Sequence, residues 1–168
     1  MLKKLLIAGL EILILVLLIV SMVFIVEGVS IGEELYSEAY VICQPNDFVN
    51  VRERPSSRSE VVGRYETGDK VFLDGREKGG FSHIVHTGLE TEDAWICTAY
   101  LVDDKPEWLN QSATVVSKGR LAARKNIDGK RRCWLRNGDG IKVYWFSNEW
   151  CVTDKGFVRT DFIDLDGE

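Results

Sequence analysis

The sequence predicts an all-β protein, with two small β-barrels that follow a single N-terminal transmembrane helix. Three observations support this prediction. An apolar run of 22 residues, from Leu5 to Val26, is interrupted by one charge, Glu11. From Tyr40 onward apolar residues alternate with polar ones, and no window of about 11 residues shows the sustained stripe of a helix. A series of motifs then returns in the same order after Pro106.

The apolar run is long enough to serve as a membrane anchor. At about 1.5 Å per residue it forms a helix of roughly 33 Å, and a hydrocarbon core is about 30 Å thick. A cleaved secretory signal is the alternative, but its apolar region usually has about 7–15 residues, and Gly28 and Ser30 offer poor cleavage sites. We therefore expect residues 1–30 to be an anchor helix, or an uncleaved signal. Glu11 lies near the charged end of the run. We favour a carboxylate that is tolerated close to the headgroups over one with a functional contact inside the membrane.

The charges on either side of the run predict its orientation. Lys3 and Lys4 precede it, whereas the segment between the run and Arg52 holds only acidic charges: Glu27, Glu33, Glu34, Glu38 and Asp47. An excess of Lys and Arg keeps its end of a span in the cytoplasm. The chain is therefore predicted to be a single-pass protein of the cytoplasmic membrane, N-terminus inside and C-terminal domains outside. Residues 31–39 are predicted to be a short acidic stalk.

The first barrel is predicted over residues 40–104. Period-two alternation between turn signals predicts strands at residues 40–43, 48–52, 61–65, 70–74 and 81–86, with a closing strand around Trp95 and Ile96. Val71 and Leu73 fall on one face of their strand. The charged break Asp103-Asp104-Lys105-Pro106 marks the end of this domain.

A second, degenerate copy is predicted over residues 112–165. The segment 121–124 takes the place of 49–52, the segment 138–143 that of 68–71, and Trp150 that of Phe81. Residues 156–163 then repeat the closing pattern, with Phe157 and Phe162 as its aromatics. The second copy is shorter because its last hairpin lacks the acidic loop at residues 87–93 of the first.

The motifs of the first copy resemble the bacterial SH3-like domain family. That family opens with Leu-Asn-Val-Arg-x-x-Pro-Ser, and residues 49–56 read Val-Asn-Val-Arg-Glu-Arg-Pro-Ser. It closes with Gly-Trp-Val-x-x-x-Tyr-Leu, and residues 94–101 read Ala-Trp-Ile-Cys-Thr-Ala-Tyr-Leu. The resemblance implies a small β-barrel binding module, but it does not identify the ligand. Our first hypothesis for the ligand is cell-wall material, either peptidoglycan or an anionic polymer. The alternative is an adaptor or structural subunit that docks another envelope protein.

The four cysteines, Cys43, Cys97, Cys133 and Cys151, lack the Cys-x-x-Cys spacing of a zinc site. Outside the cytoplasm such thiols can be bridged. The first and last strands of SH3-like barrels run close together, so the resemblance implies a Cys43–Cys97 disulfide and leaves Cys133 to pair with Cys151. Four cysteines allow three connectivities, and the other two remain open.

The charge distribution bears on the partner. The formal net charge is −5, and residues 1–30 contribute nothing to it, which argues against nucleic acid as a ligand. Eight basic residues nevertheless lie between residues 118 and 136, a segment with a single acidic residue, Asp128. The basic residues are Lys118, Arg120, Arg124, Lys125, Lys130, Arg131, Arg132 and Arg136. Such a run is most often a solvated basic face. The alternative is a surface that binds an anionic polymer, lipid headgroups or an acidic partner.

Within that run, Arg131, Arg132 and Arg136 are the candidate ligands for carboxylates or phosphates. Trp145 and Trp150 are the candidate rings for stacking on a sugar or peptide, because Tyr144-Trp145-Phe146 places aromatics on both faces of one strand. In the opposing interpretation Trp134 and Trp150 complete a small core.

No catalytic, metal or cofactor site is predicted. His83 and His86 would point to opposite faces of a strand, so they are expected at the surface or an edge and cannot share a metal. Cys97 with His83 is disfavoured as a catalytic pair, because a peptidase domain needs roughly another hundred residues. The acidic loop 90–93 lacks the ligand register of a calcium loop. The chain also lacks a phosphate-binding loop, a zinc-peptidase motif and a nucleophile elbow.

Overall fold

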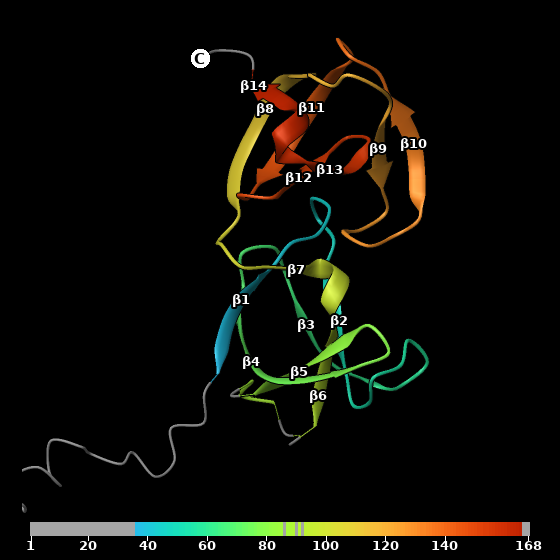
Figure 1. Cartoon of the computed structure of the whole chain (residues 1–168). Coiled ribbons are helices and arrows are strands. Elements are labelled where there is room, and N and C mark those ends of the chain that lie inside the picture. The colour runs from blue at the N-terminus through green and yellow to red at the C-terminus, as the bar shows by residue number, and fades with distance from the viewer. Residues whose placement is uncertain (1–35, 86, 90, 92, 166–168) are drawn as a thin grey trace, which may run out of the picture. The chain divides into compact units, whose positions relative to one another are not determined.

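The computed structural model describes residues 36–165, apart from residues 86, 90 and 92. The prediction of an all-β chain is confirmed over this range, which forms two seven-stranded antiparallel sheets with two single-turn 3₁₀ helices (Figure 1). The first sheet contains β1 (Ser37–Val41), β2 (Val49–Arg52), β3 (Val61–Tyr65), β4 (Lys70–Lys78), β5 (Phe81–Val85), β6 (Ala94–Cys97) and β7 (Leu101–Val102). The second contains β8 (Glu107–Val115), β9 (Leu121–Arg124), β10 (Arg131–Leu135), β11 (Gly140–Phe146), β12 (Trp150–Thr153), β13 (Gly156–Arg159) and β14 (Ile163–Leu165).

The predicted anchor helix, residues 1–30, and most of the predicted stalk lie outside the described residues. Among the residues that are described, no helix is both long enough and apolar enough to cross a membrane.

The two sheets have the same strand order. The first runs β3-β2-β6-β5-β4-β1-β7 and the second β10-β9-β13-β12-β11-β8-β14, so each strand corresponds to the one seven places later. In each sheet a 3₁₀ turn leads into the last strand, at Thr98–Tyr100 (η1) and Thr160–Phe162 (η2). The predicted equivalence of residues 121–124 with residues 49–52 matches the positions of β9 and β2. That the sheets are two copies of one domain stays a prediction.

Alternation explains why the central strands bury what they do. In β2 Val49 and Val51 are buried, and the alternate residues of the strand are half-buried. In β9 Leu121 and Ala123 are the buried residues at the equivalent positions. The two side chains of β2 belong to the apolar core of the first sheet, and the two side chains of β9 belong to the separate core of the second sheet. Fully burying a Val or Leu side chain contributes about 1.5–3 kcal/mol, so the alternation itself fixes which face of each strand turns inward.

Equivalent turns hold the two sheets in the same shape. The side chain of Asp69 accepts the N–H of Glu66 at 2.7 Å, and Asp139 accepts the N–H of Arg136 at 2.7 Å. The glycine inside each turn, Gly68 or Gly138, has a φ of 93° or 82°. L-residues rarely adopt that conformation, which is why a Gly-Asp pair appears at both places.

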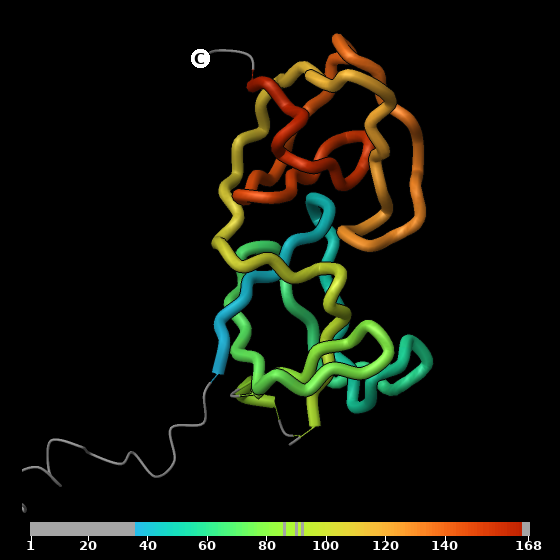
Figure 2. The backbone as a smooth tube through the Cα atoms, in the orientation of Figure 1, coloured from blue at the N-terminus to red at the C-terminus, as the bar shows by residue number. Residues whose placement is uncertain are grey.

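A third apolar cluster joins the two sheets. Ile42 and Val102 of the first sheet pack with Val152 and Phe157 of the second, and all four are buried. The ring of Tyr100 meets that of Phe157 edge-on, with centroids 6.1 Å apart. The loop after β9 also reaches back along the first sheet, where the Ile127 N–H donates to the Ala99 carbonyl at 3.1 Å (Figure 2). The described residues accordingly belong to one compact unit.

Candidate binding surface

The three predicted arginines lie at one edge of the second sheet. Arg131 and Arg132 begin β10, the strand at the end of the sheet order, and Arg136 directly follows it. In Figure 1 this strand lies on the side of the sheet away from β8. All three side chains are exposed. An edge strand leaves room for a ligand, since its outer side is not covered by another strand.

An exposed tryptophan lies among these arginines, and it is Trp134. Its side chain is 45% exposed. The Arg131 guanidinium lies 4.4 Å from the Trp134 ring centroid and the Arg120 guanidinium 5.9 Å from it. We call this group, together with Arg132 and Arg136, the basic surface.

A bulge in β10 builds the basic surface. Arg131 pairs with Arg124 and Cys133 with Ala123, so β10 carries one residue more than β9 across this interval. In a regular strand Arg131 and Trp134 would point to opposite faces, because they are three residues apart. The extra residue reverses the alternation and places the Arg131 guanidinium over the outward ring.

The charges of the basic surface are unopposed within the described residues. No carboxylate there forms an ion pair with Arg120, Arg131, Arg132 or Arg136, whereas Arg159 is bound by Glu149 at 3.3 Å and Asp161 at 3.2 Å. Guanidinium groups that protein carboxylates do not satisfy can bind an external carboxylate or phosphate by paired hydrogen bonds.

The two predicted tryptophans lie elsewhere in the second sheet. Trp145, in β11, is half-buried and meets Trp108 edge-on at 4.9 Å. Trp150, at the start of β12, packs against the apolar cluster between the sheets, with Arg159 5.6 Å from its ring centroid. The structure therefore does not bring Trp145 or Trp150 together with the predicted arginines. The interpretation that assigned Trp134 to the core is wrong, because its neighbours Cys133 and Leu135 take the inward positions of β10.

All four cysteines carry free thiols, and neither implied disulfide is present. The reason lies in the strand order. β7 pairs with β1, whereas β6, which ends at Cys97, lies three positions away from β1 in the sheet. Cys43 follows β1 and is therefore not adjacent to Cys97 in the sheet. Cys43 instead makes a 3.3 Å contact with the Thr67 hydroxyl, and Cys151 donates to the Val158 carbonyl at 3.4 Å. Burial raises the pKa of Cys151 to about 12.

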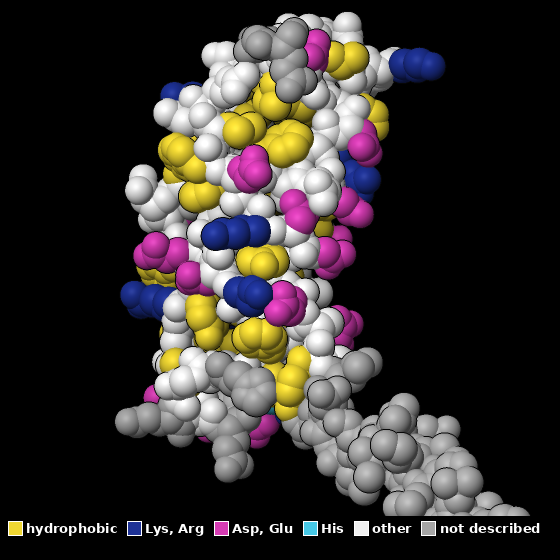
Figure 3. Space-filling view, turned by 90° about the vertical axis from the view of Figure 1, so that its left-hand side faces the viewer, with side chains coloured by type: hydrophobic (Ala, Val, Ile, Leu, Met, Phe, Trp, Pro, Cys, Tyr) yellow, Lys and Arg dark blue, Asp and Glu magenta, His cyan; other side chains and the backbone are white. Residues whose placement is uncertain are grey.

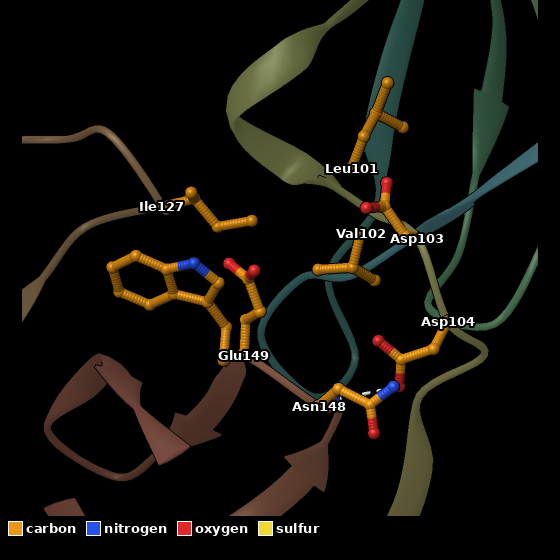
Figure 4. A pocket seen from close by; sticks show the side chains of 8 residues that line it. Leu101, Val102, Asp103, Asp104, Ile127, Asn148 and Glu149 are labelled. Atoms are coloured by element: carbon orange, nitrogen blue, oxygen red, sulfur yellow. Dashed lines mark hydrogen bonds between the residues drawn. The ribbon is translucent and has the colours of Figure 1, made fainter. Parts of the chain in front are cut away.

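A second candidate is a pocket between the sheets (Figure 4). Its volume is about 290 Å³, and its lining includes three carboxylates: Asp103, Asp104 and Glu149. Two of these are already engaged. Asp104 accepts the Asn148 backbone N–H at 2.9 Å, and Glu149 pairs with Arg159. The pocket is therefore a weaker candidate for a charged ligand than the basic surface.

His83 differs from the expectation of a surface histidine. It is 1% exposed, its Nδ1 lies 2.9 Å from an Asp74 carboxylate oxygen, and its ring meets Trp95 edge-on. Burial raises the pKa of Asp74, but hydrogen bonds from Arg76 and the charge of the nearby His83 lower it by more. The pKa of Asp74 is therefore below its ordinary value. His86 lies outside the described residues. Among those described, no group of three or more His, Cys, Asp or Glu side chains has the arrangement of a metal site.

Comparison with known proteins finds a family model that matches part of the first sheet. The model of the bacterial SH3 domain family matches residues 47–102. Among solved structures, NlpC1 from Trichomonas vaginalis is similar at 13% identity and a TM-score of 0.36, covering 81% of this chain and 45% of that one. NlpC2 from the same organism is similar at 13% identity and a TM-score of 0.33, covering 82% and 50%.

The chain thus spans about half the length of these two structures. No curated protein matches the sequence. The segment that matches the bacterial SH3 domain model runs from the loop before β2 to the end of β7.

Proposed function

We propose that this chain is a non-enzymatic binding module that the N-terminal helix anchors in the cytoplasmic membrane, with both sheets outside. Its ligand is an anionic polymer of the cell wall, and the basic surface on β10 binds it. The second sheet is a divergent copy of the bacterial SH3 domain, and its ligand surface lies at the β10 edge.

The observation that supports this proposal most directly is the exposed Trp134 ring between Arg120 and Arg131. A guanidinium over an exposed ring contributes about 0.5–1 kcal/mol, which holds Arg131 near one position before any ligand arrives. Arg132 and Arg136 add forked donors on either side of the ring along the chain. An extended polymer of repeated phosphates or carboxylates can engage several such donors at once, and its affinity then exceeds that of any single contact.

Among the described residues, the side that includes β1 and β8 differs from the basic surface. This face carries hydrophobic side chains, with both acidic and basic side chains among them (Figure 3). A mixed surface of this kind attracts an anionic polymer weakly, because neighbouring charges of opposite sign offset each other and salt screens exposed charges beyond a Debye length of about 8 Å.

The decisive experiment is co-sedimentation of the full-length chain, in detergent, with purified cell walls. Walls that retain their anionic polymer are compared with walls from which acid has extracted it. We expect retention on the first, loss of retention as salt rises, and a weak signal on the second. Retention that is independent of the anionic polymer would contradict the proposal.

A pair of variants tests the site itself. Reversal of both Arg131 and Arg132 to Glu should weaken retention by roughly tenfold or more, because attraction becomes repulsion at the ligand. Reversal of Arg54 and Arg58, exposed in the β2–β3 loop, changes net charge equally and should leave retention unchanged. Equal binding by both double variants would make the run a solvated face and favour the adaptor alternative.

A further inference from the structure

The end of β8 and the second 3₁₀ turn, η2, form an apolar face that is open to solvent within the described residues. β8 pairs with β14, which directly follows η2, so these segments lie side by side (Figure 1). Val116, just after β8, is 51% exposed, and Phe162, in η2, is 38% exposed. The two side chains line a hollow of about 620 Å³ together with Ser117, Lys118, Asn137 and Asp161. We call these residues the β8–η2 face.

The corresponding face of the first sheet is covered. In the second sheet the Val116 N–H donates to the Phe162 carbonyl at 2.8 Å, and at the corresponding place in the first sheet the Ile42 N–H donates to the Tyr100 carbonyl at 2.9 Å. Ile42 is buried in the apolar cluster that joins the two sheets, and Tyr100 packs against that cluster. The same position in the fold is thus an interface in the first sheet and an open apolar face in the second. Exposed apolar faces often mark sites of protein interaction.

A second copy of the chain cannot cover the β8–η2 face in the way that the second sheet covers the first. The covering side chains of that junction include Val152 and Phe157, which pair across β12 and β13, and each copy already uses them in its own junction. The corresponding pair across β5 and β6 is His83 and Trp95. His83 Nδ1 lies 2.9 Å from an Asp74 carboxylate oxygen, and burying that charged group in a junction would cost free energy. Head-to-tail stacking of copies is therefore unfavourable, which leaves a two-fold arrangement.

The β8–η2 face is complementary to itself. Val116 and Lys118 belong to the segment after β8, whereas Asp161 and Phe162 belong to η2. A two-fold axis between these two segments exchanges them. It therefore places Val116 of one copy against Phe162 of the other, and Lys118 of one copy near Asp161 of the other. Lys118 forms no ion pair within the described residues, and Arg159 contacts Asp161 through one carboxylate oxygen, Oδ2, at 3.2 Å.

We propose that two copies of this chain associate through the β8–η2 face, as a two-fold dimer of their second sheets. The dimer removes Val116 and Phe162 of both copies from water, and two Lys118–Asp161 pairs, one on each side of the axis, fix its register. Few residues line the face compared with the roughly 20–30 a side of a standard interface, so the association is weak in solution. The N-terminal helix expected from the sequence would hold copies in one membrane and so raise their effective concentration.

The test is sedimentation equilibrium of the full-length chain, in a zwitterionic detergent whose density the solvent matches, over a range of protein-to-detergent ratios. We expect an equilibrium between monomer and dimer. Val116→Glu places a charge in the middle of the face and should raise the dissociation constant roughly tenfold or more. Val61→Glu is the matched control, because Val61 on β3 of the first sheet is similarly exposed, at 41%, and it should leave the constant unchanged. A parent chain that stays monomeric throughout would overturn the proposal and leave the face to a different protein. A dimer that is equally stable in Val116→Glu would overturn it as well, since another surface would then hold the copies together.

An exchange of charges tests the two-fold register, and it does not depend on how Val116→Glu folds. Lys118→Asp leaves two acidic side chains at each pair, and Asp161→Lys leaves two basic ones, so each variant alone should dimerise roughly tenfold more weakly than the parent. An equimolar mixture of the two variants restores opposite charges on both sides of the axis, so it should associate within about threefold of the parent at low salt and lose this rescue as salt rises. Circular dichroism should be the same for all these chains, because both positions are exposed. A mixture that associates no better than the separate variants would refute the two-fold arrangement.

Discussion

At the scale of single residues, Gly156 is where the backbone leaves least space. Its φ is 128°, in the region that L side chains rarely adopt, and a Cβ there would collide with the Arg124 carbonyl oxygen. Gly156 opens β13, whose next residue, Phe157, pairs with Arg124 of β9. The close approach of these two strands therefore depends on the absence of a side chain at position 156.

Replacement of Gly156 by Ala should lower the free energy of unfolding by about 2 kcal/mol or more, because the strained φ and the backbone collision add. Gly140→Ala is the control: Gly140 has no positive φ and nothing lies within 4 Å of its added Cβ, so the change should stay within about 1 kcal/mol. Urea unfolding followed by tryptophan fluorescence measures both. Equal effects of the two substitutions would contradict the geometry at β13.

Cys151 is a residue whose chemistry follows from its burial. It is fully buried in the core of the second sheet, and burial raises its pKa to about 12. The thiolate is the reactive form, and near pH 8.5 only about 1 in 3,000 such thiols would be ionised. Cys133, in the same sheet, is half-buried on the edge strand.

Alkylation at pH 8.5 should therefore modify Cys133 in the folded chain while Cys151 stays unmodified until the chain unfolds. Mass spectrometry of the labelled peptides measures both rates. In denaturant without reductant all four cysteines should be alkylated, as free thiols require. Modification of Cys151 as fast as Cys133 would contradict the buried position, and pairs of protected cysteines in denaturant would restore the disulfides that the resemblance implies.

At the scale of elements, the pattern of apolar residues and turn signals predicted several strands with their observed bounds. Residues 61–65 were predicted as a strand and are observed as β3. Residues 121–124 were predicted as the equivalent of residues 49–52 and are observed as β9. The start of β12 at Trp150 also matches the start of β5 at Phe81. These patterns are local, because each side chain faces either the core or solvent according to its place in the strand.

Irregular pairing is what the sequence did not predict. β4 was expected over residues 70–74 but extends to Lys78 through a register irregularity between Leu73 and Glu77. The bulge in β10 is of the same kind, and it decides the candidate site. The charges of Arg131 and Arg132 were evident from the sequence, but the contact of Arg131 with the Trp134 ring was not. A bulge depends on the hydrogen bonds of the partner strand, which no single strand's pattern contains.

At the scale of the whole molecule, one strand order supports two different surfaces. The first sheet contains the segment that matches the bacterial SH3 domain, and the second repeats its topology with eight bases between residues 118 and 136. The cluster of Ile42, Val102, Val152 and Phe157 joins the sheets and excludes those side chains from ligand binding. This junction was not predictable from the sequence, because it depends on contacts between residues that lie far apart in the chain.

The orientation of the chain in the membrane is the prediction on which the cell-wall ligand depends. Lys3 and Lys4 precede the apolar run, and the first base after it is Arg52. A reporter enzyme that needs disulfides for activity, fused after Glu168, should therefore be active. A fluorescent protein that matures only in the cytoplasm should be dark at the same position.

Substitution of both Lys3 and Lys4 by Glu is the control for the cause of this orientation. It removes the positive charge before the run, so the activity of the disulfide-dependent fusion should fall and the fluorescence of the other fusion should rise. Strong fluorescence from the parent fusion would instead place both sheets in the cytoplasm. The cell-wall polymer would then be out of reach of the basic surface, and the free thiols of all four cysteines would be the state expected of a reducing compartment.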